Sequence, residues 1–358
     1  MSAAAKSEAT PLSVDVIVDN FNYARYLEAA IESALAQTYA HTSVIVVDDG
    51  STDNSKEVIA AFGDAILPVL KENGGQSSAF NAGLEHARGE IVIFLDADDM
   101  LLPFAAERVA ATFEARPGLA KAHYRMEVID RDGRRTGEVK PPVHIRLPEG
   151  DLREATARFA FDLARPPTSG NAFAASVLKA MAPLPPARPS AADWYVVYSS
   201  ALFGPVAAID EPLGLYRVHG SNWYEPSQPS LELEHVRKTI VRMERARRHL
   251  REVATQLGMA VDAHDAAMCE IGWRAISRKL DAPRHPIEGD TLPGLLAAGA
   301  HAARRRFDVN GVMKLAFVSW LACLVLTPRR ISWWLSEVFM FPERRRGLNT
   351  WLARLHRR

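Results

Sequence analysis

The stretch Ile-Val-Ile-Phe-Leu-Asp-Ala-Asp-Asp at residues 91–99 does most to determine the predicted fold. Its first five residues, Ile91–Leu95, are all apolar, which is typical of a short strand buried on both faces of a parallel sheet. The strand then stops at four residues, three of them aspartates. In an open α/β sheet, ligands bind beyond the carboxyl ends of the strands. These nine residues therefore predict a buried strand with an acidic binding site at its end.

The residues upstream alternate between strand and helix. Residues 14–18 and 43–47 are rich in β-branched side chains and predict strands, and residues 24–38 between them carry apolar side chains at helical spacing. This alternation predicts an open, mostly parallel, Rossmann-like α/β sheet. The first two strands also end in polar or acidic residues, at 19–22 and 48–49. We expect all three clusters to meet at one edge of the sheet.

Local signals mark the elements between the second strand and residue 91. Asn54 and Glu57 have the spacing of a capping box at the start of a helix. Residues 65–70 predict a weaker strand, and the proline within it suits only a sheet edge. A further helix is expected from Gln76, with Gly89 as the residue that closes it.

Charge is distributed unevenly along the 358 residues. Lys and Arg total 43, as do Asp and Glu, so the net charge is zero. Residues 301–358 nevertheless hold twelve Arg or Lys against three acids, a net charge of +9. A basic tail on an acidic body favours an anionic partner surface, membrane lipid rather than nucleic acid. We therefore expect no nucleic-acid partner.

Cysteine content and the N-terminus indicate the compartment. Cys269 and Cys323 are the only cysteines, so no disulfide framework or zinc spacing is present, which suits a reducing environment. Residues 1–13 lack the apolar core of a secretory signal and predict a flexible tail. These features predict a cytoplasmic protein.

The C-terminal part is predicted to be helical. Residues 231–257 form a long helix whose apolar positions recur at three- and four-residue steps, which suits either a buried core helix or a short dimerising coiled coil. Residues 315–326 are uncharged, but a bilayer crossing needs about 20 apolar residues. The stretch 331–341 is aromatic, and it is followed by three arginines. The segment 315–341 is thus interfacial, re-entrant or a buried helical subdomain with a basic face. The aromatic residues expected at an interface are Trp333, Trp334 and Phe339.

The acids at the end of strand 91–95 suit a hard divalent cation. Asp96 and Asp98 offer oxygen ligands of the kind that Mg²⁺ and Mn²⁺ prefer. Acidic triplets are also common in turns, and Asp48-Asp49-Gly50 would suit a simple turn as well. The position of Asp96 and Asp98 at the expected binding edge favours the metal interpretation.

The N-terminal part of the chain resembles a known family. Residues 14–102 resemble the nucleotide-binding half of family 2 glycosyltransferases, which have the GT-A fold. One departure is Asp19-Asn20, where many members have Pro-Thr or a similar pair, and it falls beside the base pocket. The matching segments, in correct order and spacing, are Phe21-Asn22-Tyr23, Ala34-Leu35-Ala36-Gln37-Thr38-Tyr39, Val46-Val47-Asp48-Asp49-Gly50-Ser51-Thr52-Asp53, Asn73-Gly74-Gly75-Gln76 with Asn81-Ala82-Gly83, and Phe94-Leu95-Asp96-Ala97-Asp98-Asp99.

The resemblance implies a nucleotide-sugar donor, most simply a UDP-sugar, and a set of donor-binding residues. An acid of the Asp48/Asp49 pair should bind the base, and Asp96 the ribose or the metal. Asp98 should be a ligand of Mg²⁺ or Mn²⁺. Backbone N–H groups near Gly74 and Gln76, at a helix N-terminus, should approach the diphosphate or the sugar. The donor-binding residues implied in full are Asn22, Asp48, Asp49, Gly74, Gln76, Asp96 and Arg217.

Further matches lie downstream of residue 102. The family's general base is an acid, often within a Glu-Asp pair, and Asp193 is the matching residue, with Ala192 in place of the glutamate. A helix N-cap is the alternative role for Asp193. Thr168–Asn171 resembles the strand that lines the sugar pocket. In the segment Tyr216–His219, the resemblance makes Arg217 a phosphate contact and His219 a metal ligand.

Together these observations predict a GT-A catalytic domain over residues 14–225 and a helical, basic region over 226–358. The expected reaction is a metal-assisted inverting displacement onto a hydroxyl of a glycan or lipid-linked acceptor, at the inner membrane face. A dinucleotide-dependent oxidoreductase is disfavoured because the first strand is not followed by Gly-x-Gly-x-x-Gly. The remaining alternative is a non-catalytic protein that binds nucleotide-sugars or nucleic acid.

Overall fold

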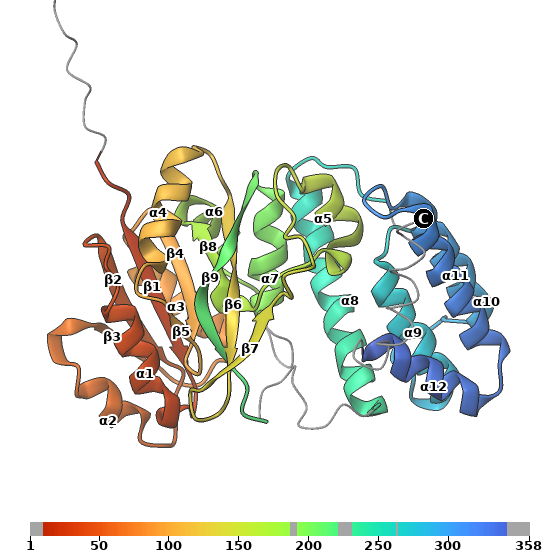
Figure 1. Ribbon diagram of the computed structural model, residues 1–358, viewed down its shortest axis with the longest axis horizontal. Helices are drawn as coiled ribbons and strands as arrows, with labels where there is room; N and C mark the ends of the chain where they lie inside the picture. The colour runs from red at the N-terminus through yellow and green to blue at the C-terminus, as the bar shows by residue number, and fades with distance from the viewer. Residues whose placement is uncertain (1–9, 187–191, 221–230, 263, 342–358) are drawn as a thin grey trace, which may run out of the picture. The chain divides into compact units, whose positions relative to one another are not determined.

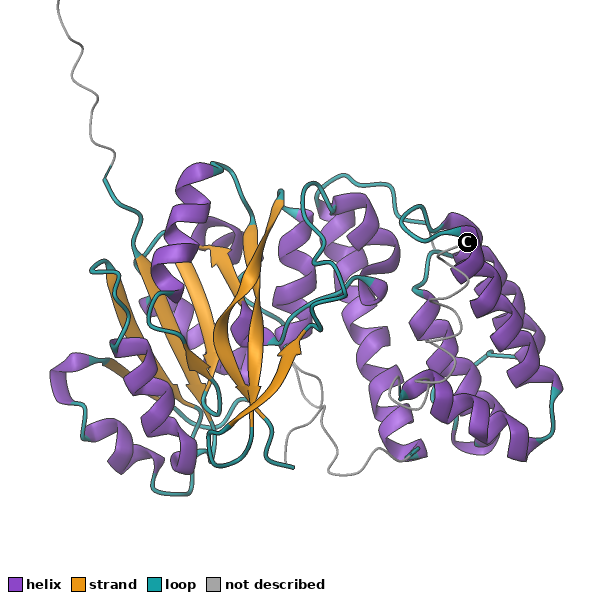
Figure 2. Cartoon of the chain, viewed as in Figure 1, coloured by secondary structure: helices purple, strands orange, loops and turns teal. Residues whose placement is uncertain are grey.

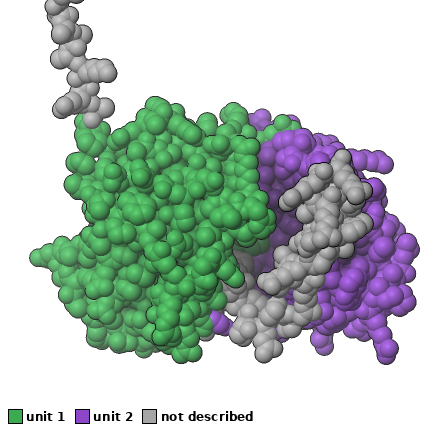
Figure 3. Space-filling model, viewed as in Figure 1, with its two compact units in different colours: residues 1–154, 164–219 green, residues 155–163, 220–358 purple. Residues whose placement is uncertain are grey.

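The computed structural model describes residues 10–186, 192–220, 231–262 and 264–341. The chain divides into two compact units, drawn in different colours in Figure 3. Unit 1 comprises residues 1–154 and 164–219, and unit 2 comprises residues 155–163 and 220–358. The predicted boundary at residue 225 lies outside the described residues. The short segment 155–163 groups with the helical unit, although it lies within the predicted catalytic domain.

The first half of the sheet in unit 1 is parallel, as predicted (Figure 1). Strand β3 lies at the sheet edge, in agreement with the proline at position 68. The strands are β1 (Val14–Asn20), β2 (Thr42–Asp48), β3 (Leu67–Leu70) and β4 (Ile91–Asp96). The helices between them are α1 (Ala24–Leu35), α2 (Ser55–Ala60) and α3 (Gln76–His86).

The second half of the sheet, which the sequence did not predict strand by strand, is mixed. Within the described residues the order is β3-β2-β1-β4-β8-β6-β9-β5, with β7 paired to β6. The pairs β4–β8, β6–β8, β6–β7 and β5–β9 are antiparallel, and β6–β9 is parallel. The strands are β5 (Met100–Leu101), β6 (Lys121–Ile129), β7 (Arg135–Lys140), β8 (Asn171–Ala174) and β9 (Val206–Arg217). The helices are α4 (Ala105–Ala115), α5 (Arg153–Phe159, which ends in unit 2), α6 (Ala175–Met181) and α7 (Ala192–Ser199).

Alternation along the strands determines which side chains face α3. On β1, Val14, Val16 and Val18 belong to the core formed with α1 and α4. Ile17 points to the opposite face, where a side chain at Gly83 of α3 would collide with it. On β4, Phe94 stacks on Phe80 of α3 with ring centroids 4.0 Å apart. Side chains two residues apart on a strand share a face. Asp19 lies two residues after Ile17, and Asp96 lies two residues after Phe94, so both aspartates lie on the side of the sheet that faces α3.

Two local predictions were wrong. Asn54 makes no capping hydrogen bond, and the carboxylate of Asp53 instead accepts from the backbone N–H of Ser55 at 3.1 Å. Helix α3 ends at His86, and Gly89 does not have the left-handed backbone of a closing glycine. Ser13, the last residue of the predicted flexible tail, donates hydrogen bonds from its backbone N–H and its hydroxyl to Glu90. Residues 1–9 lie outside the described part.

The regular elements described in unit 2 are helices, joined by loops (Figure 2). On α8, Val236 and Ile240 belong to the core of this unit, and the other apolar positions are largely buried as well. This burial favours the core-helix interpretation of residues 231–257, because a coiled coil would need the same positions. The helices are α8 (Leu233–Gln256), α9 (Met268–Leu280), α10 (Leu292–Arg305), α11 (Gly311–Leu326) and α12 (Arg329–Met340).

Helices α11 and α12 each bury one side in the core of unit 2. Phe339 stacks on Trp320 with centroids 4.2 Å apart, and Trp333 packs against the same core. These two aromatics are therefore not free to enter a membrane interface, whereas Trp334 is exposed. No described helix is both long enough and apolar enough to span a bilayer. The arginines at 344–346 fall outside the described residues.

Candidate active site

Asp48 and Asn22 shape the loop that follows β2. Asp48 is fully buried, and its carboxylate accepts hydrogen bonds from Asn20 Nδ2 at 2.8 Å and from the backbone N–H of Ser51 at 3.0 Å. Asn22 has a left-handed backbone with φ of 60°, and its Oδ1 accepts from the backbone N–H of Thr52 at 2.7 Å. Both predicted donor-binding residues thus lie at the carboxyl edge of the sheet with their side chains bonded to the loop.

Asp49 anchors the loop before α3. Its carboxylate accepts from Lys71 Nζ at 2.6 Å and from the backbone N–H groups of Gly74 and Gly75 at 2.9 and 2.6 Å. A side chain at Gly74 would collide with Ser78, so this close approach requires glycine. Asp49, Gly74 and the N-terminus of α3 are therefore held together, as expected for a loop that carries a ligand.

Gln76 links β1 and β4 at the edge where the acids gather. Its Nε2 lies 3.3 Å from Asp19 Oδ2 and 3.3 Å from Asp96 Oδ1. Asp19 and Asp96 are register partners on these adjacent strands. The sequence placed Asp19 among the polar residues expected at this edge, but it assigned no role to this residue.

Asp98 is paired with His219. His219 Nε2 lies 2.9 Å from Asp98 Oδ2, and the imidazole stacks on Tyr26 at 5.1 Å between centroids. The structure therefore brings together two of the three predicted metal ligands from segments 121 residues apart. The third, Asp96, faces Gln76. The carboxylate oxygens suit Mg²⁺ or Mn²⁺, and the imidazole offers a nitrogen ligand beside them.

Asp99 and Ser169 hold the acidic turn in shape and were missed as functional residues. Asp99 is buried, and its carboxylate accepts from Ser169 Oγ at 2.7 Å and from the backbone N–H of Arg217 at 2.9 Å. The same Ser169 Oγ accepts from the backbone N–H of Asp96 at 3.1 Å. The resemblance of Thr168–Asn171 to a pocket-lining strand was the signal available for Ser169.

Arg217 is used to fix this turn. Its Nε donates to the backbone carbonyl of Asp98 at 2.9 Å, and its guanidinium lies 4.8 Å from the ring centroid of Tyr26. The residue is buried. The guanidinium of Arg217, for which the sequence predicted a contact with the donor phosphate, therefore also supports the acidic turn.

Burial and mutual repulsion change the acidity of the clustered carboxyl groups. Burial, aided by the charges of Asp98 and Asp193, raises the pKa of Asp19 to about 7. Burial, with the charges of Asp19, Asp99, Asp98 and Asp193, raises the pKa of Asp96 well above its usual value. Asp193, whose charge contributes to both pKa shifts, is a buried residue of α7, and this helix packs on α3. Such crowding of like charges is relieved by a cation or by hydrogen-bond donors.

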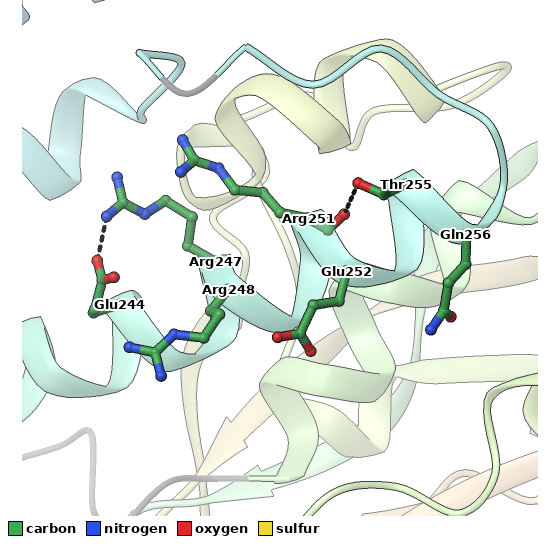
Figure 4. A pocket seen from close by; sticks show the side chains of 7 residues that line it. All are labelled: Glu244, Arg247, Arg248, Arg251, Glu252, Thr255 and Gln256. Atoms are coloured by element: carbon green, nitrogen blue, oxygen red, sulfur yellow. Dashed lines mark hydrogen bonds and ion pairs between the residues drawn. The ribbon is translucent and has the colours of Figure 1, made fainter.

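Two other features lie in unit 2. The ligand atoms of Asp262, Asp265 and His301 all lie within 4.8 Å of one another, but Arg305 already forms ion pairs with both acids at 3.1 Å. A hollow of about 560 Å³ runs along α8 (Figure 4). Its arginines are partly engaged, since Arg247 pairs with Glu244. Neither feature lies at the carboxyl edge of the sheet, where the donor site is expected. The hollow is lined by Glu244, Arg247, Arg248, Arg251, Glu252, Thr255 and Gln256.

The fold and the acidic edge of unit 1 together define a class. A Rossmann-like parallel half, continued by a mixed half, with Asp-x-Asp closing the central strand β4, is the arrangement of GT-A glycosyltransferases.

Comparisons with known proteins identify the family. The model of "Glycosyl transferase family 2" matches residues 15–160. An uncharacterized glycosyltransferase of Nostoc sp., alr2836, is 34% identical over 252 residues, which cover 69% of this chain and 77% of that protein. One from Rickettsia typhi is 43% identical over 90 residues, 25% of this chain and 28% of that protein. The chain therefore belongs to glycosyltransferase family 2 and is a glycosyltransferase.

A solved structure confirms the fold. The structure of residues 1–349 of S. aureus TarS in complex with UDP is similar, with a TM-score of 0.50, over 93% of this chain and 92% of that one. Sequence identity is 16%, so this likeness bears on the GT-A fold alone.

Proposed function

We propose that unit 1 transfers a sugar from a nucleotide-sugar, in the first place a UDP-sugar, to an acceptor hydroxyl with inversion at the anomeric carbon. The observation that carries this proposal is that Asp193 is a buried acid on α7, which packs on α3, and that its charge helps to raise the pKa of Asp19 and of Asp96. Asp193 is the proposed general base. A non-catalytic nucleotide-sugar- or nucleic-acid-binding protein is not favoured, because the related proteins are named glycosyltransferases.

In the proposed mechanism each residue has a separate task. Asp98 and His219 would hold Mg²⁺ or Mn²⁺, which supplies Lewis-acid stabilisation of the departing diphosphate, and Asp96 would either complete this metal site or bind the donor ribose. Asp48 or Asp49 would accept from the base, and the N-terminus of α3 would approach the diphosphate through its backbone N–H groups. Asp193 would accept the proton of the attacking hydroxyl. Single displacement requires no covalent enzyme intermediate.

A donor screen tests this proposal. Purified full-length protein is incubated with UDP-, GDP- and dTDP-sugars and Mn²⁺ or Mg²⁺, and the release of nucleoside diphosphate is measured with and without EDTA. The proposal requires release from at least one donor and its loss in EDTA. Release that is unaffected by EDTA would overturn the metal assignment, and absence of both binding and release with every donor would overturn the function.

We further propose that unit 2 binds an anionic membrane surface, which would bring the enzyme to a lipid-linked or glycan acceptor of the cell envelope at the inner face. The support comes from α11, where Val312, Leu315 and Leu326 are 58%, 68% and 78% exposed and lie on one stripe of the helix. Ile331 and Trp334 of α12 are exposed as well. Arg329 and Arg330 lie between the two groups, and each arginine near an anionic leaflet contributes about 1 kcal/mol.

Vesicle sedimentation tests this second proposal with a matched pair of variants. Leu315→Glu places a charge on the exposed stripe, and Val143→Glu makes the same kind of change at an exposed position of unit 1. Wild type and Val143→Glu should pellet with vesicles that contain anionic lipid, whereas Leu315→Glu should not. Equal sedimentation of the two variants would show that this stripe is not the binding surface.

A further inference from the structure

The Asp-x-Asp motif divides its two acids between different partners. Asp98 faces His219, with 2.9 Å between the nearest atoms. Asp96 lies on the other side of the motif, where Gln76 joins it to Asp19 through two contacts of 3.3 Å. The acidic edge therefore contains two separate pairs, one of a carboxylate with an imidazole and one of two carboxylates.

The pair of Asp19 and Asp96 is costly in the absence of a ligand. The two residues are register partners on adjacent strands, and like charges directly opposite each other destabilise a sheet. Asp19 Oδ1 is buried, and no hydrogen bond reaches it from the described residues. One amide, Gln76 Nε2, serves both carboxylates. A ligand that donates hydrogen bonds to both acids would satisfy them.

Hydroxyl groups fit this pair better than a second cation does. The amide hydrogens of Gln76 point toward the two carboxylates, and their partial positive charge would repel a cation placed between them. A vicinal diol offers two neighbouring O–H donors for two neighbouring carboxylates. A ribose has such a diol at its 2′ and 3′ positions, and carboxylates at the carboxyl edge of Rossmann-like sheets are established acceptors for ribose hydroxyls.

We propose that Asp19, together with Asp96, accepts the 2′- and 3′-hydroxyls of the donor ribose and so selects ribonucleoside diphosphate sugars over 2′-deoxyribonucleoside ones. This inference rests on the proposed function, because it assumes that a nucleotide-sugar occupies this edge. Asp19 is then a specificity-determining residue that replaces the neutral residue of many relatives. The enzyme should use UDP- or GDP-sugars and discriminate against dTDP-sugars.

Binding of nucleotide analogues tests the proposal. The Kd values of UDP, 2′-deoxy-UDP and 3′-deoxy-UDP are measured by calorimetry with Mn²⁺ for wild type, Asp19→Ala, Asp19→Asn and the surface control Asp132→Ala. If GDP is the better ligand in the donor screen, the guanosine series is used. Wild type and the control should bind each deoxy analogue roughly 10- to 100-fold more weakly, the loss expected for one charge-assisted hydrogen bond.

Asp19→Ala should weaken UDP binding by the same factor and should abolish the discrimination against one of the two deoxy analogues. Asp19→Asn, which preserves the side-chain shape, should reduce that discrimination if the alanine variant fails to fold. Unchanged discrimination in a folded Asp19 variant would overturn the proposal, as would a wild type that binds 2′-deoxy-UDP as tightly as UDP. Mn²⁺ binding in the absence of nucleotide should be unchanged by Asp19→Ala, and its loss would make Asp19 a metal ligand instead. Failure of wild type to bind any nucleotide would count against the proposed function itself.

Discussion

Replacement of Ser169 by alanine should loosen the turn that carries the acidic motif. Its hydroxyl accepts from the backbone N–H of Asp96 at 3.1 Å and donates to the carboxylate of Asp99 at 2.7 Å. Loss of one neutral and one charge-assisted hydrogen bond, with buried groups left behind, corresponds to roughly 2–4 kcal/mol of unfolding free energy. Because the Ser169 hydrogen bond lowers the pKa of Asp99, whose burial otherwise raises it, the substitution should also raise that pKa further.

The same substitution at Ser199 is a matched control. Ser199 is fully buried, but no hydrogen bond to its hydroxyl is present within the described residues. Urea unfolding of both variants at neutral pH, followed by tryptophan fluorescence, gives the two free-energy changes. Ser199→Ala should stay within about 1 kcal/mol of wild type. Equal losses for the two variants would refute the assignment of Ser169 as the support of the turn.

Three further results are expected. Asp98→Asn should reduce Mn²⁺ affinity, measured by calorimetry, at least tenfold, and His219→Gln should also weaken it; wild-type affinity in both would remove these residues from the metal site. Because the pKa of Asp19 is raised from 3.8 to about 7 in the folded state, the metal-free protein should lose stability as the pH rises from about 4 to about 7, and Asp19→Asn should flatten this slope in urea titrations. Gly50→Ala should cost more stability than Gly118→Ala. Both glycines have positive φ, but a Cβ at Gly50 would lie 2.6 Å from a backbone nitrogen, whereas a Cβ at Gly118 would meet nothing within 4 Å. Equal losses of the two variants in thermal unfolding would contradict this reasoning.

The sequence predicted the first half of the sheet well because local signals there agree with the final packing. The apolar run Ile91–Leu95 is buried on both faces, and the proline in the strand at 67–70 does lie at an edge. The strands after residue 103 pair over long distances and in mixed directions: β8 is antiparallel to β6, and β9 is parallel to β6. No short-range pattern encodes such pairings, so the mixed half of the sheet was not predicted.

The candidate site residues came from motifs, whereas the residues that support them did not. Asp96, Asp98 and Asp193 carry recognisable motifs, and the charges of Asp98 and Asp193 both contribute to the raised pKa of Asp96. Ser169 and Asp99 contribute through hydrogen bonds between segments 70 residues apart, which a motif does not reveal. Aromatic residues near basic ones suggested an interface for Phe339, yet it stacks on Trp320, because helical periodicity alone does not distinguish a core from a membrane face.

The central claim is that Asp193 is the base in sugar transfer, and one comparison tests it directly. In Asp193→Asn the buried side chain keeps its shape and loses its ability to accept a proton. With the donor found in the screen, turnover should fall by roughly 10²–10⁴-fold while the Kd of the donor stays within a factor of a few, and exposed Asp151→Asn should behave as wild type. Unchanged turnover in a folded Asp193→Asn variant that binds donor normally would contradict the account and place the base elsewhere.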